Sequence, residues 1–397
     1  MRRLILGLLN FINRLVPKGN IVIFNSFPDL EGNAYALFKY MVREQGGIFD
    51  EYRMVWSVNA GSDVKETDKR LRSICKDKRY SVVKKLSIRG LFTFFRASGI
   101  VTTHNYITGL YTAKGQTHYH LAHGMPYKAV GNRIKNANEK DLFQADITIA
   151  DSEYFREIVS DVLNMPEERV YVTGQPADDA VLDTDNALEK LGIDHKMYTR
   201  VILWSPTYRQ SDVGSLRSDG FGGGFDTEYV LTTGADEISA VLQEKNMLLM
   251  VKFHPMDVLR NRVFDEHRNI MIIKPEQLSE AGVTFNELMG ECDVFLTDYS
   301  SAFETYMLTG RPVAFIRDDM EDFERERGFS IDNPDDLAAG ERIRNMEQLK
   351  AYLMDMDSMN ERWKEKYEKA RSLIHAYTDG RASQRVYRLI FDGKGHV

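Results

Sequence analysis

Short apolar runs alternate with amphipathic stretches along most of this chain after Pro17. In the first half, strands are predicted at residues 20–25, 52–58, 100–103, 117–121, 147–150 and 170–173. A polar, charged stretch at 183–191 interrupts the pattern and is interpreted as a linker. In the second half, strands are predicted at 201–204, 247–252, 270–273, 294–297 and 313–316. Continuous apolar strands that alternate with helices indicate parallel sheets covered on both faces.

Two successive units of this kind predict an α/β fold with two Rossmann-like domains that face each other across a cleft. The boundaries expected from the pattern are an amphipathic helix at 1–18, a first domain at 19–185 and a second domain at 186–397. The end of the chain, about 346–390, is expected to be largely helical.

The first 18 residues form a basic segment without acidic side chains. Their apolar positions recur at three- and four-residue spacings, which predicts one apolar stripe on a helix. The apolar stretch is far shorter than the ~20 residues of a membrane span. We expect a helix that lies in the headgroup region of an anionic leaflet, and the alternative is a first helix packed on the domain core. The stripe consists of Leu4, Ile5, Leu8, Leu9, Ile12, Leu15 and Val16.

Composition excludes several classes of protein. A formal net charge of −7 over 397 residues argues against a surface that grips nucleic acid. The two cysteines, Cys75 and Cys292, exclude a disulfide framework and a thiolate zinc site. Neither a P-loop nor a Gly-x-Ser-x-Gly elbow occurs, so no cofactor and no metal site are expected.

Chemically useful residues follow several predicted strands, and ligands of open parallel sheets bind beyond the carboxyl ends of strands. Ser300 and Ser301 open a helical stretch whose free N–H groups would suit a phosphate, although an ordinary N-cap is the simpler interpretation. Arg209 and His254 could add charge and donors to the same anion. These strand ends together predict a diphosphate-binding cleft.

His123 precedes Gly124 directly after the strand at 117–121. An imidazole there suits a general base that deprotonates an acceptor hydroxyl. The alternative is a histidine that hydrogen-bonds a loop. His118 and His120 are interpreted as strand residues, and His104 is a weaker candidate at another strand end.

Several segments, in this order, resemble the CDP-glycerol glycerophosphotransferase family, the primases and polymerases of wall teichoic acid. They are NIVIFNSFPDLEGNAYALFKYM, AHGMPYK, VTGQPADD, SPTYR, KFHP, TDYSSAFETYMLTGRPVAF, FERERGF and DGRASQRV, and they cover about residues 20–390. Met125 and Tyr127 replace the usual Thr and Leu of the His-Gly motif. Ala177 and Asp178 stand where Arg-Asn is usual, so no role is carried over to Asp178 or Asp179.

The resemblance implies a GT-B-like fold in which the first domain binds the acceptor and the second binds a CDP-alditol. By position, His123 resembles the family's catalytic base and His254 its second essential histidine. Substrate contacts are implied for Gly124, Pro206, Thr207, Arg209, Thr297, Asp298, Ser300, Ser301 and Glu304.

The implied reaction is attack by an acceptor hydroxyl on the phosphorus that bears the glycerol, with CMP leaving. The expected partners are CDP-glycerol or CDP-ribitol, a lipid-linked saccharide or glycerophosphate acceptor, and an anionic membrane surface at the cytoplasmic face of the cell membrane. A primase, a polymerase and a capsule-decorating transferase all fit. A nucleotide-sugar glycosyltransferase of the same architecture and a non-catalytic membrane scaffold are the alternatives.

Overall fold

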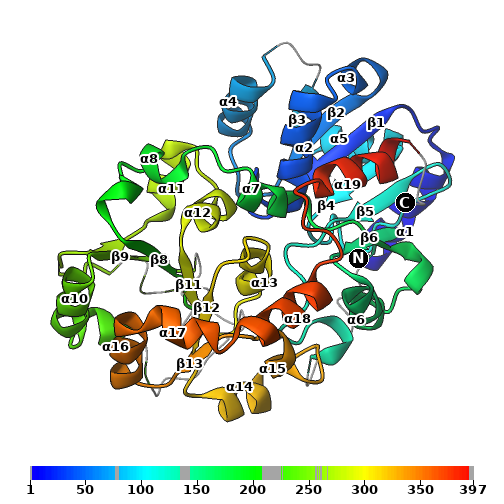
Figure 1. Ribbon diagram of the computed structural model, residues 1–397. Coiled ribbons are helices and arrows are strands. Elements are labelled where there is room, and N and C mark those ends of the chain that lie inside the picture. The colour runs from blue at the N-terminus through cyan, green and yellow to red at the C-terminus, as the bar shows by residue number, and fades with distance from the viewer. Residues whose placement is uncertain are drawn as a thin grey trace. The chain divides into compact units, whose positions relative to one another are not determined.

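The computed structural model describes residues 2–76, 80–134, 144–207, 225, 227–254, 257, 259, 262–265 and 267–392. The chain divides into two compact units (Figure 1). The first unit contains residues 1–125, 141–179 and 379–397, and the second contains residues 126–140 and 180–378.

A seven-stranded parallel sheet forms the centre of the first unit, in the order β3-β2-β1-β4-β5-β6-β7. Its strands are β1 (Ile21–Asn25), β2 (Arg53–Val58), β3 (Tyr80–Lys84), β4 (Gly99–Thr102), β5 (Thr117–His120), β6 (Ile147–Ala150) and β7 (Val170–Val172). Its helices are α1 (Arg2–Leu15), α2 (Gly32–Glu44), α3 (Ile48–Glu51), α4 (Val64–Ile74), α5 (Ile88–Arg96), α6 (Glu153–Leu163) and α19 (Ala382–Phe391), with short 3₁₀ turns η2 (Glu167–Arg169) and η3 (Pro176–Asp178).

Alternate side chains of β1 enter two different cores, which explains why this strand is apolar throughout. Val22 and Phe24 pack into the core beneath α2, α4 and α19. Ile23 packs into the opposite core, with α5 and the inner side of α1. Both faces of the sheet are therefore covered by helices, as the sequence pattern predicted.

Helix α19 brings the end of the described chain back to the first unit, beside α2 (Figure 1). The Asp179 carboxylate accepts hydrogen bonds of 2.8 Å from the backbone N–H groups of Ala382 and Ser383, at the start of α19. Val386 and Leu389 then complete the core that α2 covers. The predicted linear division at 19–185 and 186–397 did not include this return.

The second unit has a six-stranded parallel sheet in the order β10-β9-β8-β11-β12-β13. Its strands are β8 (Arg200–Trp204), β9 (Met247–Val251), β10 (Ile270–Ile272), β11 (Val294–Thr297), β12 (Val313–Ile316) and β13 (Glu341–Ile343). Its helices are α8 (Ala187–Lys190), α9 (Thr227–Leu231), α10 (Ala235–Glu244), α11 (Pro275–Ala281), α12 (Phe285–Glu291), α13 (Ala302–Met307), α14 (Met320–Glu326), α15 (Pro334–Leu337), α16 (Met346–Met354), α17 (Met356–Glu361) and α18 (Lys364–Ile374), with η1 (Gly131–Arg133) and η4 (His195–Met197). Helix α7 (Asp179–Leu182) lies at the passage between the units.

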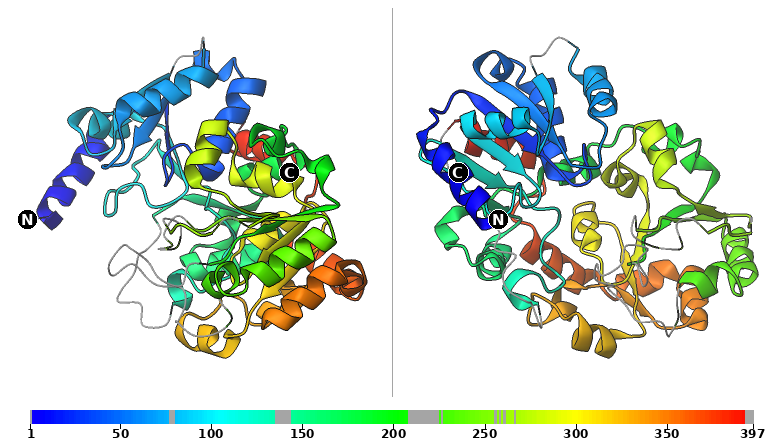
Figure 2. Two further views of the ribbon diagram at one scale, coloured as in Figure 1. Left: turned by 90° about the vertical axis from the view of Figure 1, so that its left-hand side faces the viewer. Right: turned by 180° about the vertical axis from the view of Figure 1, so that it is seen from behind.

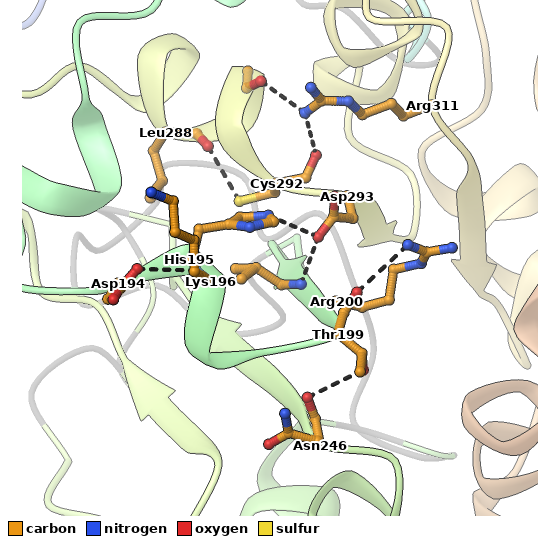
Figure 3. Close-up of polar contacts among 12 residues, drawn as sticks. Asp194, His195, Lys196, Thr199, Arg200, Asn246, Leu288, Cys292, Asp293 and Arg311 are labelled. Atoms are coloured by element: carbon orange, nitrogen blue, oxygen red, sulfur yellow. Dashed lines mark hydrogen bonds and ion pairs between the residues drawn. The ribbon is translucent and has the colours of Figure 1, made fainter.

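Polar contacts fix the amino end of this second sheet (Figure 3). Asp293 accepts a 2.8 Å hydrogen bond from the Val201 N–H, and its Oδ2 lies 3.0 Å from His195 Nε2. Arg311 donates 2.8 Å hydrogen bonds from Nη1 to the carbonyls of Gly290 and Cys292. Since β8 and β11 are tied here, their opposite, carboxyl ends are held side by side.

Each strand predicted from the sequence is present, with ends that differ by one residue at most. The pattern missed β3 and β13, which are edge strands with mostly half-exposed side chains and charged residues at their ends. It also did not predict that the chain enters the second unit as early as Pro126. Lys128 there forms an isolated antiparallel β-bridge with Phe329. Short, half-buried edge strands carry a weak apolar signal.

Candidate active site

His123 stands in a tight turn at the carboxyl end of β5 in the first unit. Ala122 has φ 55° and Gly124 has φ 130°, so two left-handed residues flank the imidazole. Such a conformation is costly for a residue with a Cβ, and it is found disproportionately at functional sites. The turn leaves His123 exposed at the rim of the sheet.

One hydrogen bond sets the proton arrangement of this imidazole. His123 Nδ1 lies 3.2 Å from the Thr103 carbonyl oxygen, which can only accept. In the neutral ring Nδ1 therefore carries the proton, and Nε2 keeps its lone pair. A base needs this tautomer.

Asn33 holds the backbone that leads into the turn. Its Nδ2 donates to the carbonyls of Leu121 at 2.7 Å and Ala122 at 3.2 Å, and its Oδ1 accepts from the Ala177 N–H at 2.9 Å. The Asn33 side chain is 1% exposed. The segment resemblance included Gly32-Asn33 but gave it no role, and the structure makes Asn33 a positioning residue for His123.

Three further histidines lie near His123 in the first unit. His118 and His120 are buried within β5, as predicted, and burial lowers their pKa to about 4 and about 3. Burial, followed by the charges of Lys85 and His123, lowers the pKa of His104 to about 4. All three are therefore neutral at physiological pH and add no positive charge to the turn.

In the second unit, polar and charged residues follow four adjacent strands at one edge of the sheet. The order β9-β8-β11-β12 places four residues at neighbouring strand ends: His254, Thr207, Asp298 and Arg317. His254 is exposed, whereas Pro206 and Thr207 are buried. Arg209, predicted to bind the donor, lies outside the described residues.

The Asp298 carboxylate ties two of these strand ends together. It accepts from the Thr207 N–H at 3.0 and 2.9 Å, from the Thr207 hydroxyl, and from the Tyr299 N–H at 2.6 Å. Asp298 is 4% exposed. Because these donors occupy its oxygens, this carboxylate orders the loops after β8 and β11, and a direct contact with the donor stays a prediction.

The other predicted donor residues fall into two groups. Ser300 and Ser301 are partly exposed; Ser301 is the N-cap of α13 but makes no side-chain cap, while Ser300 Oγ accepts from the Ala302 N–H at 3.3 Å. Thr297 and Glu304 are 0% and 2% exposed, and the Thr297 hydroxyl donates to the Ser205 carbonyl at 2.8 Å. Because Ser300 and Ser301 are partly exposed, they are better placed to contact a substrate than the buried Thr297 and Glu304.

Arg317 was missed, although it directly follows the predicted strand 313–316. It is 4% exposed, donates from Nε to the Asp298 carbonyl at 2.7 Å and from Nη2 to Tyr127 Oη at 3.0 Å, and lies 5.0 Å from the Tyr299 ring centroid. Inspecting the end of every predicted strand would have found it. It lines a cavity of about 410 Å³ together with Asp318, Asp319, Met320, Glu321, Asp322, Asp335, Arg342 and Arg344.

In the part of the chain that the structure describes, no three His, Cys, Asp or Glu side chains come together in a way that could hold a metal ion.

Two doubly wound units, each with a parallel sheet that carries polar residues at its carboxyl edge, form a GT-B-like α/β fold. The same fold occurs in the wall teichoic acid polymerase TagF, with a TM-score of 0.72 and 20% identity over 99% of this chain and 95% of that one. A putative UDP-N-acetylglucosamine 2-epimerase from Listeria monocytogenes matches with a TM-score of 0.54 and 15% identity, over 94% and 97% of the chains. The model of the CDP-glycerol:poly(glycerophosphate) glycerophosphotransferase family matches residues 8–392, and the chain belongs to this family.

Relatives of this chain include teichoic acid polymerases that use different alditols. The ribitol-phosphate polymerase TarL of Staphylococcus aureus is 23% identical over 385 residues, and the poly(glycerol phosphate) polymerase of Staphylococcus epidermidis is 23% identical over 397 residues. Each match covers 94% of this chain, which spans 63% and 50% of the two relatives' own lengths. A ribitol-phosphate primase of Bacillus spizizenii is also 23% identical, over 57% of this chain and 54% of its own.

Proposed function

We propose that this protein transfers glycerol phosphate from CDP-glycerol to a hydroxyl of a membrane-linked acceptor and releases CMP, in the synthesis of teichoic acid or a related capsular polymer. The observation that carries the proposal is His123, an exposed imidazole with Nε2 available as a base, in the family's His-Gly motif. Membership of the glycerophosphotransferase family supports the donor, as does a structure of the TagF relative obtained with CDPG.

In the proposed reaction, His123 Nε2 takes the proton of the acceptor hydroxyl as its oxygen attacks the phosphorus that bears the glycerol. The new oxygen–phosphorus bond forms while the bond to the CMP oxygen breaks, and CMP leaves with the electron pair. Such transfers depend on alignment and on charge stabilisation at the phosphoryl oxygens. His254, Arg209, Ser300 and Ser301 are the groups proposed for the second task.

CDP-ribitol is the alternative donor, because TarL and the Bacillus spizizenii primase are named as ribitol-phosphate enzymes. The test is CMP release from CDP-glycerol, CDP-ribitol and a UDP-sugar, each with a lipid-linked disaccharide and with a glycerophosphate-primed acceptor. We expect CMP from CDP-glycerol. Release from CDP-ribitol alone would change the donor, and turnover of the UDP-sugar alone would overturn the proposal. The acceptor that supports turnover separates a primase from an extending enzyme.

Helix α1 supports a peripheral position at an anionic membrane. Its inner side packs on the first unit through Leu9 and Ile12, and the Asn10 and Asn13 side chains donate to the Gly109 and Tyr111 carbonyls at 2.8 and 2.9 Å. Helix α1 lies at the outer edge of the first unit (Figure 2). Another stripe of the same helix is apolar and exposed, and α5, which shares its core, adds two exposed side chains. The exposed fractions are Leu4 80%, Ile5 52%, Leu8 59%, Phe11 58%, Leu15 67%, Ile88 90% and Phe92 60%.

Both interpretations of the amphipathic segment thus find support in one helix, packed on one side and apolar on another. No helix in the described ranges is long and apolar enough to cross a membrane. The exposed stripe and the basic residues Arg3 and Arg14 suit a bilayer surface that carries negative charge.

The double variant Leu8→Ser/Phe11→Ser is expected to lower partitioning onto phosphatidylglycerol vesicles at least tenfold. Burying one such side chain contributes about 1.5–3 kcal/mol, and the substitution leaves the packed side of α1 intact. Vesicle co-sedimentation measures the effect, with activity on a water-soluble acceptor expected to persist. Tyr229→Ser, at a 46% exposed apolar position in the second unit, is the matched control. Equal sedimentation of both variants and the wild type would contradict the membrane role of α1.

A further inference from the structure

Lys85 is the first residue after β3, and its ammonium group reaches across the carboxyl edge of the first sheet. Its Nζ donates a 3.0 Å hydrogen bond to Asn25 Oδ1 at the end of β1, and lies 4.9 Å from the centroid of the Tyr106 ring. Asn25 is 0% exposed and donates in turn to the Ser57 carbonyl at 2.7 Å. The position of the Lys85 ammonium is therefore fixed by buried neighbours.

The Lys85 charge has lost much of its hydration without gaining an ion pair among the described residues. Asp29, whose negative charge raises the pKa of Lys85, accepts instead from the Asn59 N–H at 3.1 Å, from Asn59 Nδ2 at 3.0 Å and from the Ser62 hydroxyl. Burial outweighs Asp29 and lowers the pKa of Lys85 to about 8. At pH 7 the Lys85 ammonium is still mostly protonated. A partly dehydrated cation of this kind is suited to binding an anion.

His104, at the end of β4, lies between Lys85 and His123 in the strand order. Its Nδ1 is 3.3 Å from Thr103 Oγ1, and the carbonyl of the same Thr103 accepts from His123 Nδ1. The ring also contacts Phe27, edge to face at 6.1 Å, and Phe27 is 69% exposed. The neutral imidazole of His104 thus lies next to the proposed base, and the Lys85 cation and the exposed ring of Phe27 both interact with His104.

We propose that Lys85 and His104 form a binding site for a phosphate group carried by the acceptor. The site rests on the proposed function, since it deepens the role of the first unit as the acceptor-binding unit. Lys85 Nζ lies at the end of β1, and β4 and β5 follow in the sheet, so it is two strand spacings, about 10 Å, from the strand that carries His123. That is the length scale of a sugar or an alditol phosphate unit. The site therefore selects acceptors that carry a phosphate one unit away from the attacked hydroxyl.

The test uses sn-glycerol 3-phosphate as the probe, with the full chain and no donor. Isothermal titration calorimetry should detect binding to the wild type, and Lys85→Gln should weaken it at least tenfold. Lys84→Gln is the matched control, because Lys84 is the exposed last residue of β3. Lys85→Arg, which keeps the charge, should retain a large part of the affinity.

Turnover provides a second readout. Lys85→Gln should raise KM for a phosphate-bearing acceptor, with kcat and the KM of the CDP-alditol unchanged. Equal probe affinity of the wild type and Lys85→Gln, or no probe binding to the wild type at millimolar concentration, would overturn the site. An unchanged thermal midpoint in Lys85→Gln keeps the comparison valid, and Lys85→Met serves if glutamine unfolds the chain. If the protein releases no CMP but binds the probe in a way that depends on Lys85, the phosphate site would stand and the proposed function would be wrong.

Discussion

Replacing His123 with alanine is expected to lower kcat by about 10²–10⁴-fold while the affinity for CDP-glycerol stays unchanged. The imidazole is proposed to act on the acceptor hydroxyl, and its hydrogen bond to the Thr103 carbonyl leaves Nε2 free for that proton. A general base contributes to the chemical step and makes no contact that the donor needs for binding. CMP release under saturating substrates measures kcat, and calorimetric titration with CDP-glycerol measures the donor affinity.

The matched control is His195→Ala, which removes a histidine at the amino end of the second sheet (Figure 3). We expect its kcat to stay at the wild-type level in folded protein. A His123→Ala variant that loses affinity for CDP-glycerol would contradict the role of this residue as the acceptor's base. Full activity of the variant would have the same consequence.

Asp298→Asn is expected to lower the free energy of unfolding by about 3–5 kcal/mol and to weaken binding of the CDP-alditol. The buried carboxylate accepts from two backbone N–H groups and from the Thr207 hydroxyl, and an amide nitrogen placed there would face these donors. Loss of this contact would release the loops after β8 and β11 together. Urea unfolding, followed by circular dichroism, gives the stability of each variant.

The matched control is Asp332→Asn, in the same unit, where an exposed carboxylate lies 3.5 Å from Arg133. Surface pairs of this kind contribute little, so its stability should equal that of the wild type. If Asp298→Asn unfolds at the same urea concentration as this control, the contact with Thr207 has no part in holding the strand ends together.

The fold was predictable because most strands are buried on both faces. Such strands read as continuous apolar runs, as in β1, where Val22 and Ile23 enter different cores. An edge strand such as β3 is covered on fewer sides and tolerates polar residues, so its signal is weak. The attachment of α19 to the first unit was not predictable for another reason: an amphipathic helix shows which of its faces is buried, but not against which sheet.

The candidate site was predictable where it depends on strand ends, since a rule of topology places His123, His254 and Asp298 at the carboxyl edges. It was not predictable where it depends on hydrogen bonds between distant residues. Asn33 reaches the backbone of Leu121, 88 positions away, and Lys85 reaches Asn25, 60 positions away. No local pattern encodes such a pair.

The hydrogen bonds between the Asp179 carboxylate and the start of α19 have a consequence for folding during protein synthesis. The two partners are 203 residues apart, and a ribosome adding about 5–20 residues per second needs about 10–40 seconds to make the intervening chain. Throughout that time the apolar side of α2 lacks Val386 and Leu389. Most of the first unit is therefore synthesised early, but its core is complete only after α19 has been made. Until then the apolar side of α2 is exposed on the nascent chain, where a chaperone can bind.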